Sequence, residues 1–194
     1  MADNGAMRIV SNAALVSILA AWIVMALATV FRRRPWQARE IRRGRGWAWG
    51  LVLQVLSIAM LWTWRRPEPS SFLVSAVAVV LAAASVAVIL RAQRALGRQF
   101  AYQARLVEGH RLITAGPYRY VRNPIYTALF GLALATALVL SRWPVIPLFA
   151  VLYAAGTVIR IRIEEGLLRA QFGPEFEDYA RRVPALIPLP WCKL

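Results

Sequence analysis

The sequence predicts an all-α fold, a polytopic membrane protein with five transmembrane helices. Three observations predict it. Of the 194 residues 59% are hydrophobic, long stretches carry no charged side chain, and 24 basic against nine acidic residues give a net charge of +15. Soluble domains rarely combine such apolar stretches with such basic ones. No repeat or long linker divides the chain, so we treat 1–194 as a single domain.

Five uncharged stretches approach the roughly 17–25 residues that a helix needs to cross the hydrocarbon core of a bilayer. They are 13–31, 46–64, 71–90, 125–141 and 143–159. The first resembles a signal peptide with Ala-Leu-Ala as a cleavage site, but its apolar run is longer than a usual signal core. Only Arg142 separates the last two, so LSRWP predicts the tight turn of a helical hairpin. Pro144 then falls at the start of the fifth helix, where its missing N–H costs little.

The basic residues predict an orientation, because cytoplasmic loops carry an excess of Lys and Arg. Seven arginines lie in 32–45, seven lie in 91–122, and five arginines with Lys193 follow the fifth stretch. The opposite side receives only Arg8, Arg65, Arg66 and Arg142. We therefore expect an integral membrane protein, of the bacterial inner-membrane type, with its N-terminus outside and its C-terminus in the cytoplasm.

The sequence argues against nucleic acid and metal ions as partners. The basic residues are spread over three membrane-flanking segments without a recognisable nucleic-acid module, so we expect contact with membrane lipids and none with nucleic acid. His110 is the only histidine and Cys192 the only cysteine, which predicts neither a metal site nor an internal disulfide. The sequence leaves the oligomeric state open.

Two segments, 91–123 and 160–194, are neither membrane helix nor turn, and the predicted topology places both on the cytoplasmic side. The first begins by continuing the third helix until Gly97 and then forms an ordered loop. In the second, Arg160 and Glu164 are four residues apart and Arg162 and Glu165 three apart, so that both pairs can meet on a helix. Ionisable groups this close to a membrane are costly unless they pair or line a cavity, which makes them functional candidates. A break at Gly173 then precedes a short amphipathic helix.

Two blocks carry a family resemblance. GHRLITAGPYRYVRNPIYTA, followed one hairpin later by RIRIEEGLLRAQFGPEFEDYARRVPALIP, resembles the C-terminal half of the isoprenylcysteine carboxyl methyltransferase and phospholipid methyltransferase superfamily. The resemblance covers residues 109–190, with the two blocks in the family's order and spacing. It divides the domain into an N-terminal three-helix part, 1–98, and a cofactor-binding and catalytic part, 99–194.

The resemblance implies a cytosol-facing pocket for S-adenosylmethionine, formed by the loop and the short C-terminal helices, with S-adenosylhomocysteine as product. A lipophilic or prenylated substrate would arrive from the bilayer. The matching positions place Arg160 and Glu165 at the reaction centre. The implied cofactor-binding residues are His110, Leu112, Ile113, Gly116, Tyr118, Arg122, Asn123, Pro124, Tyr126 and Glu164. Two positions depart from the family pattern: Asn123 replaces a histidine, and Ala128 replaces a glycine.

The methyl acceptor stays open at this point. Arg160 would hold a carboxylate acceptor while Glu165 fixes the arginine's geometry, as in isoprenylcysteine carboxyl O-methylation. A protonated phospholipid amine would need a glutamate as base, and a small lipophilic thiol or acid also fits. The sequence also leaves open two other classes of protein, an NADPH-dependent sterol-type reductase and a non-catalytic membrane scaffold.

Overall fold

The computed structural model describes residues 2–31, 40–43, 46–97, 105–107 and 111–187. Helices dominate this part of the chain, as predicted. They are α1 (Ala2–Phe31), α2 (Trp47–Thr63), α3 (Phe72–Leu96), α4 (Pro124–Leu140), α5 (Val145–Phe172) and α6 (Pro174–Arg182). Three of them contain segments long and apolar enough to cross a membrane, namely Asn4–Phe31, Phe72–Leu96 and Val145–Phe172, whereas α2 and α4 are apolar but shorter.

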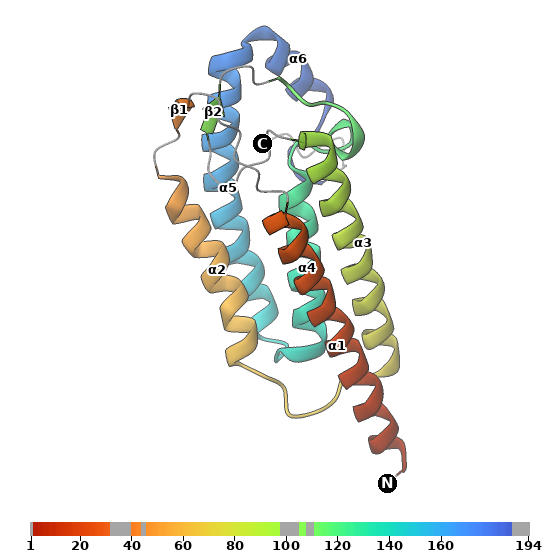
Figure 1. Cartoon of the computed structure of the whole chain (residues 1–194). Helices are drawn as coiled ribbons and strands as arrows, with labels where there is room; N and C mark the ends of the chain where they lie inside the picture. Colours follow the sequence, from red (N-terminus) through yellow and green to blue (C-terminus); the bar gives the residue numbers. More distant parts are fainter. Residues whose placement is uncertain (1, 32–39, 44–45, 98–104, 108–110, 188–194) are drawn as a thin grey trace.

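The five long helices run side by side, and α6 lies across one end of them (Figure 1). α1, α3 and α5 run in one direction and α2 and α4 in the other (Figure 1). α2 packs along α5, α3 packs along α4, and α1 contacts both α3 and α4. The segments before α4 and after α5 therefore meet at the same end of the bundle.

Small and polar residues bring α2 and α5 together. A Cβ atom at Gly50 would lie 2.6 Å from the Cγ of Arg160 and 2.7 Å from the carbonyl oxygen of Gly156. One turn further, the buried Gln54 amide donates a hydrogen bond of 2.8 Å to the Thr157 hydroxyl. Small residues permit this approach of two backbones, and polar pairs hold membrane helices together. This contact holds α5 against α2 at the turn that precedes the charged residues of α5.

The predicted boundaries are largely confirmed, with two additions. α3 ends at Leu96 with Gly97 as its cap, and only the turn 141–144 separates α4 from α5. However, α5 continues past the predicted boundary at 159 to Phe172, where Gly173 has a positive φ of 50°. The strands β1 (Glu40–Arg43) and β2 (Arg105–Val107) form an antiparallel pair that the sequence did not predict. This pair joins two of the three basic segments.

Candidate active site

The chain segment after α6 lies against the start of α4. The backbone N–H of Arg122 donates to the carbonyl of Pro184 at 2.8 Å, and that of Asn123 donates to Ala185 at 3.0 Å. Pro124 is buried as the first residue of α4, where a proline is favoured because its ring already holds a helical φ. The loop block and the C-terminal block are thus joined through their backbones.

Arg122 and Glu165 form a buried ion pair between the loop and α5. The Nε atom of Arg122 lies 2.8 Å from Oε1 of Glu165, and Nη2 lies 3.1 Å from Oε2. Both side chains are about 5% exposed or less. The remaining nitrogen of Arg122 donates to the carbonyls of Ala180 and Val183 beside the end of α6. A single guanidinium therefore holds together the loop before α4, α5 and the end of α6.

A second cluster forms around Arg160, which is 4% exposed and lies on a helix long and apolar enough to cross a membrane. Its Nε atom donates to the Tyr126 hydroxyl at 2.7 Å, and Nη2 lies 3.3 Å from Oε1 of Glu164. The Tyr126 hydroxyl donates in turn to the same Glu164 oxygen at 2.5 Å. The three side chains form a closed triangle that fixes the guanidinium.

The two adjacent glutamates have different partners, which corrects part of the prediction. Glu164 rather than Glu165 contacts Arg160, and Glu165 pairs with Arg122 and Arg169 instead of with Arg162. Glu165 lies five residues after Arg160, and only i+3 and i+4 neighbours share a face of an α-helix. Arg162 has a suitable spacing, but the carboxylate of Glu165 is held by Arg122 and Arg169. The Arg160–Glu164 pair was predicted correctly.

Asn123 contributes to the Glu165 cluster. Its side-chain amide donates to Oε1 of Glu165 and to the carbonyl of Ala185, each at 3.2 Å. An amide does this without carrying a charge, so the replacement of the family's histidine preserves a hydrogen bond at this position. Ala128, the second departure, is buried in α4 at 5% exposure.

The loop before α4 is anchored by α6. The hydroxyl of Tyr179 donates to the backbone carbonyl of Tyr118 at 2.6 Å. Burial raises the pKa of both phenols above their usual value, so both remain neutral at physiological pH. Tyr118 belongs to a short 3-10 helix, η2 (Gly116–Arg119), which packs against α3. Gly116 has a φ of 64°, a conformation that side chains disfavour.

The other predicted residues lie nearby in the chain. Leu112 and Ile113 are partly buried just before η2. His110 lies outside the described residues. The structure thus joins Arg122, Asn123 and Glu165 in one cluster and Tyr126, Arg160 and Glu164 in another.

Trp47, at the start of α2, also lies at this site and was not among the predicted residues. Its ring centroid lies 5.9 Å from Cζ of Arg160, and the Tyr126 ring lies 5.3 Å from the same atom, both within cation–π distance. Tyr153 was also missed, and its hydroxyl donates to the Tyr126 carbonyl at 2.9 Å. Neither residue belongs to the two blocks, and nothing in the sequence distinguishes Trp47 from the seven other tryptophans.

The two adjacent glutamate side chains differ in their exposure to solvent. The Glu165 side chain is 5% exposed, and its oxygens accept hydrogen bonds from Arg122 and Asn123. The Glu164 side chain is 28% exposed and lies beside the buried guanidinium of Arg160. The second cluster therefore offers a fixed cation, a reachable carboxylate and aromatic faces at one place, and so can bind a ligand that carries both charges.

The comparisons with known proteins point to methyltransferases. The sequence profile of the family described as phospholipid methyltransferase matches residues 72–175. The protein-S-isoprenylcysteine O-methyltransferase of Schizosaccharomyces pombe is 39% identical over 80 residues, which cover 41% of this chain and 34% of that protein. Protein-S-isoprenylcysteine O-methyltransferase B of Arabidopsis thaliana is 33% identical over 94 residues, covering 47% and 48%.

A third relative has a different name. The nickel-cobalt-cadmium resistance protein NccN of Alcaligenes xylosoxydans xylosoxydans is 41% identical over 81 residues, covering 40% of this chain and 36% of that protein. The matched regions span between about a third and a half of these curated relatives.

The apolar helices and the charged clusters at one end of them define an integral membrane protein with a candidate active site at the boundary of its membrane part. The family profile covers more than half of the chain, from α3 to the start of α6. The chain therefore belongs to the phospholipid methyltransferase family, within the superfamily that includes the isoprenylcysteine methyltransferases.

Proposed function

We propose that the protein transfers a methyl group from S-adenosylmethionine to a lipophilic acceptor delivered by the membrane, most like isoprenylcysteine carboxyl O-methylation. The observation that carries the proposal is the buried guanidinium of Arg160, which Tyr126 and Glu164 fix beside the aromatic ring of Trp47. A buried, pre-oriented arginine suits recognition of a carboxylate. The names of the isoprenylcysteine methyltransferase relatives support the same reaction.

The residues fit the methyl donor. S-adenosylmethionine carries an ammonium group and a sulfonium ion, and the site offers a reachable glutamate for the first and aromatic faces for the second. When bound, it supplies an electrophilic methyl group. The residues that would hold it are His110, Leu112, Ile113, Gly116, Tyr118, Asn123, Pro124, Tyr126 and Glu164. Arg122, whose nitrogens already bind Glu165 and the backbone, would shape this site from behind.

The proposed catalytic roles follow from the contacts. Arg160 would hold the acceptor carboxylate, whose oxygen is already anionic and needs no base. Glu165 would act through Arg122 and Asn123 by holding the loop in place, and is thus a positioning residue. Methyl transfer demands alignment in a dry site, and fixed side chains supply such alignment.

A phospholipid amine is the second candidate acceptor, favoured by the exposure of Glu164. An ammonium group must lose its proton before it attacks a methyl group, and Glu164 is the more exposed carboxylate of the two. The family's description, phospholipid methyltransferase, supports this alternative.

We further propose that all five long helices cross the membrane, with the N-terminus outside and the candidate active site facing the cytoplasm. α2 and α4 have 17 residues each, which at about 1.5 Å per residue gives roughly 26 Å, close to the thickness of a bilayer core. Both pack lengthwise against spanning helices. The arginine distribution supports the orientation and an inner-membrane location. The contacts of Trp47 and Gly50 with Arg160 support a single domain in which the N-terminal part, 1–98, also contributes to the site.

The proposal is tested by methyl transfer in proteoliposomes. Radiolabelled S-adenosylmethionine would be supplied with N-acetyl-farnesylcysteine in one reaction and with phosphatidylethanolamine in another. We expect label in a base-labile methyl ester of the first acceptor, lost in Arg160→Ala and retained in Arg162→Ala, because Arg162 is exposed on the same helix. Label in the amine alone would favour the second candidate, and label in neither would contradict both.

A further inference from the structure

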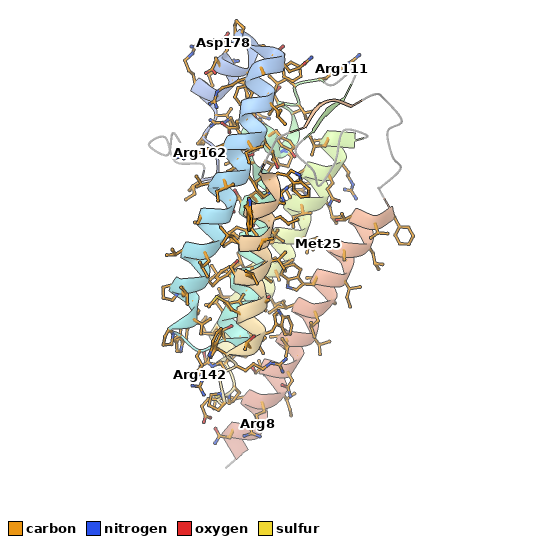
Figure 2. All side chains as sticks on the ribbon, turned by 90° about the vertical axis from the view of Figure 1, so that its left-hand side faces the viewer. Arg8, Met25, Arg111, Arg142, Arg162 and Asp178 are labelled. Atoms are coloured by element: carbon orange, nitrogen blue, oxygen red, sulfur yellow. The ribbon has the colours of Figure 1, made fainter. Side chains whose placement is uncertain are left out.

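A cavity of about 250 Å³ lies at the opposite end of the bundle from the candidate active site. It is bounded by the first part of α1, the connection between α2 and α3, and the end of α4. Figure 2 shows Arg8 at this end, together with Arg142, and Asp178 at the other end. The cavity far exceeds the ~30 Å³ that one water molecule occupies in the liquid. It can therefore hold a polyatomic ligand.

The lining of this cavity is basic. Arg8, Arg65 and Arg66 contribute three positive charges, and Glu68 contributes one negative charge. Among the described residues, none of these arginines lies within ion-pair distance of a carboxylate. The lining thus has an excess of positive charge, which attracts an anion, and guanidinium groups bind phosphate through paired N–H donors.

Two of the arginines are already oriented. Nε of Arg65 donates to the Trp62 carbonyl at 3.1 Å, and Nη1 of Arg66 lies 3.4 Å from the Leu138 carbonyl. The guanidinium of Arg66 also lies over the ring of Trp143, 5.4 Å from its centroid. These contacts use a minority of the five N–H donors of each guanidinium, so the others remain available to a ligand.

A buried hydroxyl adds a further donor. Ser11 lines the cavity and is 8% exposed. Its oxygen accepts hydrogen bonds from the backbone N–H of Ser70 at 3.2 Å and from the Ser70 hydroxyl at 3.0 Å. Because both of its acceptor positions are used and its own proton has no acceptor among the described residues, Ser11 can donate into the cavity.

The position of the cavity in the bundle also indicates the kind of ligand it would bind. Among the residues that the structure describes, the basic side chains at this end include Arg8, Arg65, Arg66 and Arg142 (Figure 2), and the first three line this one cavity. Leu15, Val139 and Leu140 complete the lining with apolar surface. α1 and α3 contain segments long and apolar enough to cross a membrane, and with the topology proposed above this end lies at the membrane surface. The combination of cations, a hydroxyl donor and an apolar side matches an amphiphile with a phosphate group.

We propose that this cavity binds a phosphate group, the chemistry that a phospholipid headgroup of the adjoining leaflet shares with free phosphate. Arg8, Arg65, Arg66 and Ser11 would bind the phosphate oxygens. The apolar side of the cavity favours the lipid as its source. The site is independent of the candidate active site and of the reaction proposed there.

The test is calorimetric titration of the full chain in detergent with dioctanoyl-phosphatidylglycerol, dioctanoylglycerol and inorganic phosphate. We expect binding of the phospholipid and none of the neutral glyceride. The double variant Arg8→Gln, Arg66→Gln should weaken phospholipid binding about tenfold or more, since hydrogen bonds to charged groups are being removed. Ser11→Ala, which keeps every charge, should weaken it several-fold. Arg142→Gln removes one charge at the same end without touching the cavity and should change affinity less than twofold.

Each outcome decides the proposal. Equal affinity of the wild type and the Arg8, Arg66 double variant would overturn it, as would equal binding of the neutral glyceride. Inorganic phosphate binding as tightly as the phospholipid would keep the anion site and overturn the lipid as its source. The unfolding temperature of each variant, measured in the same detergent, establishes that a loss of binding is not a loss of fold.

Discussion

The guanidinium of Arg122 and the carboxylate of Glu165 are 43 residues apart in the sequence and form two parallel hydrogen bonds, of 2.8 and 3.1 Å, in the interior of the protein. This pair joins the loop before α4 to the part of α5 that lies on the cytoplasmic side in the orientation we propose. The same arginine also binds two carbonyls next to α6. Because three segments converge on this one side chain, the shape of the candidate active site depends on it.

Arg122→Ala should destabilise the fold. Removing one partner of a buried ion pair leaves the other charge uncompensated, at a typical cost of about 3–5 kcal/mol. Thermal unfolding in detergent would show a lower unfolding temperature for Arg122→Ala and for Glu165→Ala. The double variant should lose less stability than the sum of the two single variants, since neither charge is then left alone. Additive effects would contradict the pairing.

The two adjacent glutamates should respond differently to the same substitution. Glu164→Gln removes the charge that faces Arg160 at the more exposed position, and we expect a loss of methyl transfer with a smaller drop in unfolding temperature than Glu165→Gln causes. Glu165→Gln weakens the buried cluster with Arg122, and we expect a lower unfolding temperature. Parallel measurement of both quantities on both variants checks this, and the reverse pattern would refute the separation of roles.

Tyr126→Phe should impair catalysis more than stability. The substitution removes the hydroxyl that accepts from Arg160 at 2.7 Å and donates to Glu164. Loss of a hydrogen bond to a charged group costs about 1.5–3 kcal/mol, which corresponds to roughly 10- to 150-fold in kcat/KM. Tyr120→Phe is the matched control, because Tyr120 is 62% exposed. Equal activity of the two variants would contradict an orienting role for Tyr126.

Gly50→Ala should disturb both packing and the site. Its new Cβ would meet the Cγ of Arg160 at 2.6 Å, so that α2 and α5 must separate or the arginine must shift. We expect a lower unfolding temperature together with weaker methyl transfer. Gly166→Ala is the control on α5, since a Cβ there meets nothing within 4 Å. This change should be neutral or stabilising by up to about 1 kcal/mol. Similar unfolding temperatures for both variants would argue against the close contact.

The sequence predicted the helices better than their partners. Uncharged stretches locate α1 to α5, and Gly97, Pro144 and Gly173 mark helix boundaries because these residues restrict or relax the backbone. The β1–β2 pair was missed, since strands of four and three residues, EIRR and RLV, are too short for an alternating apolar pattern to reveal them. Likewise, α5 extends to Phe172 because its charged residues form ion pairs along the helix, Arg160 with Glu164 and Glu165 with Arg169, which a hydropathy criterion does not register.

The contacts of the candidate active site were predicted correctly only where both partners lie on one helix. Spacing on a helix correctly paired Arg160 with Glu164, a contact within one element. It assigned Glu165 wrongly, because the partner of that residue is Arg122, which comes from another part of the chain. Trp47 reaches Arg160 only through the packing of α2 on α5, a tertiary contact without a local signal.

The central claim is that the cluster around Arg160 binds the methyl donor, and calorimetric titration with S-adenosylhomocysteine tests it most directly. The wild-type protein in detergent would be titrated with this ligand and with NADPH, and both titrations would be repeated on Glu164→Gln and on Arg162→Ala. We predict binding of S-adenosylhomocysteine alone, weakened by Glu164→Gln and unchanged by Arg162→Ala. Binding of NADPH alone would indicate a reductase, and binding of neither ligand by folded protein would indicate a non-catalytic scaffold; either result would contradict the proposed function.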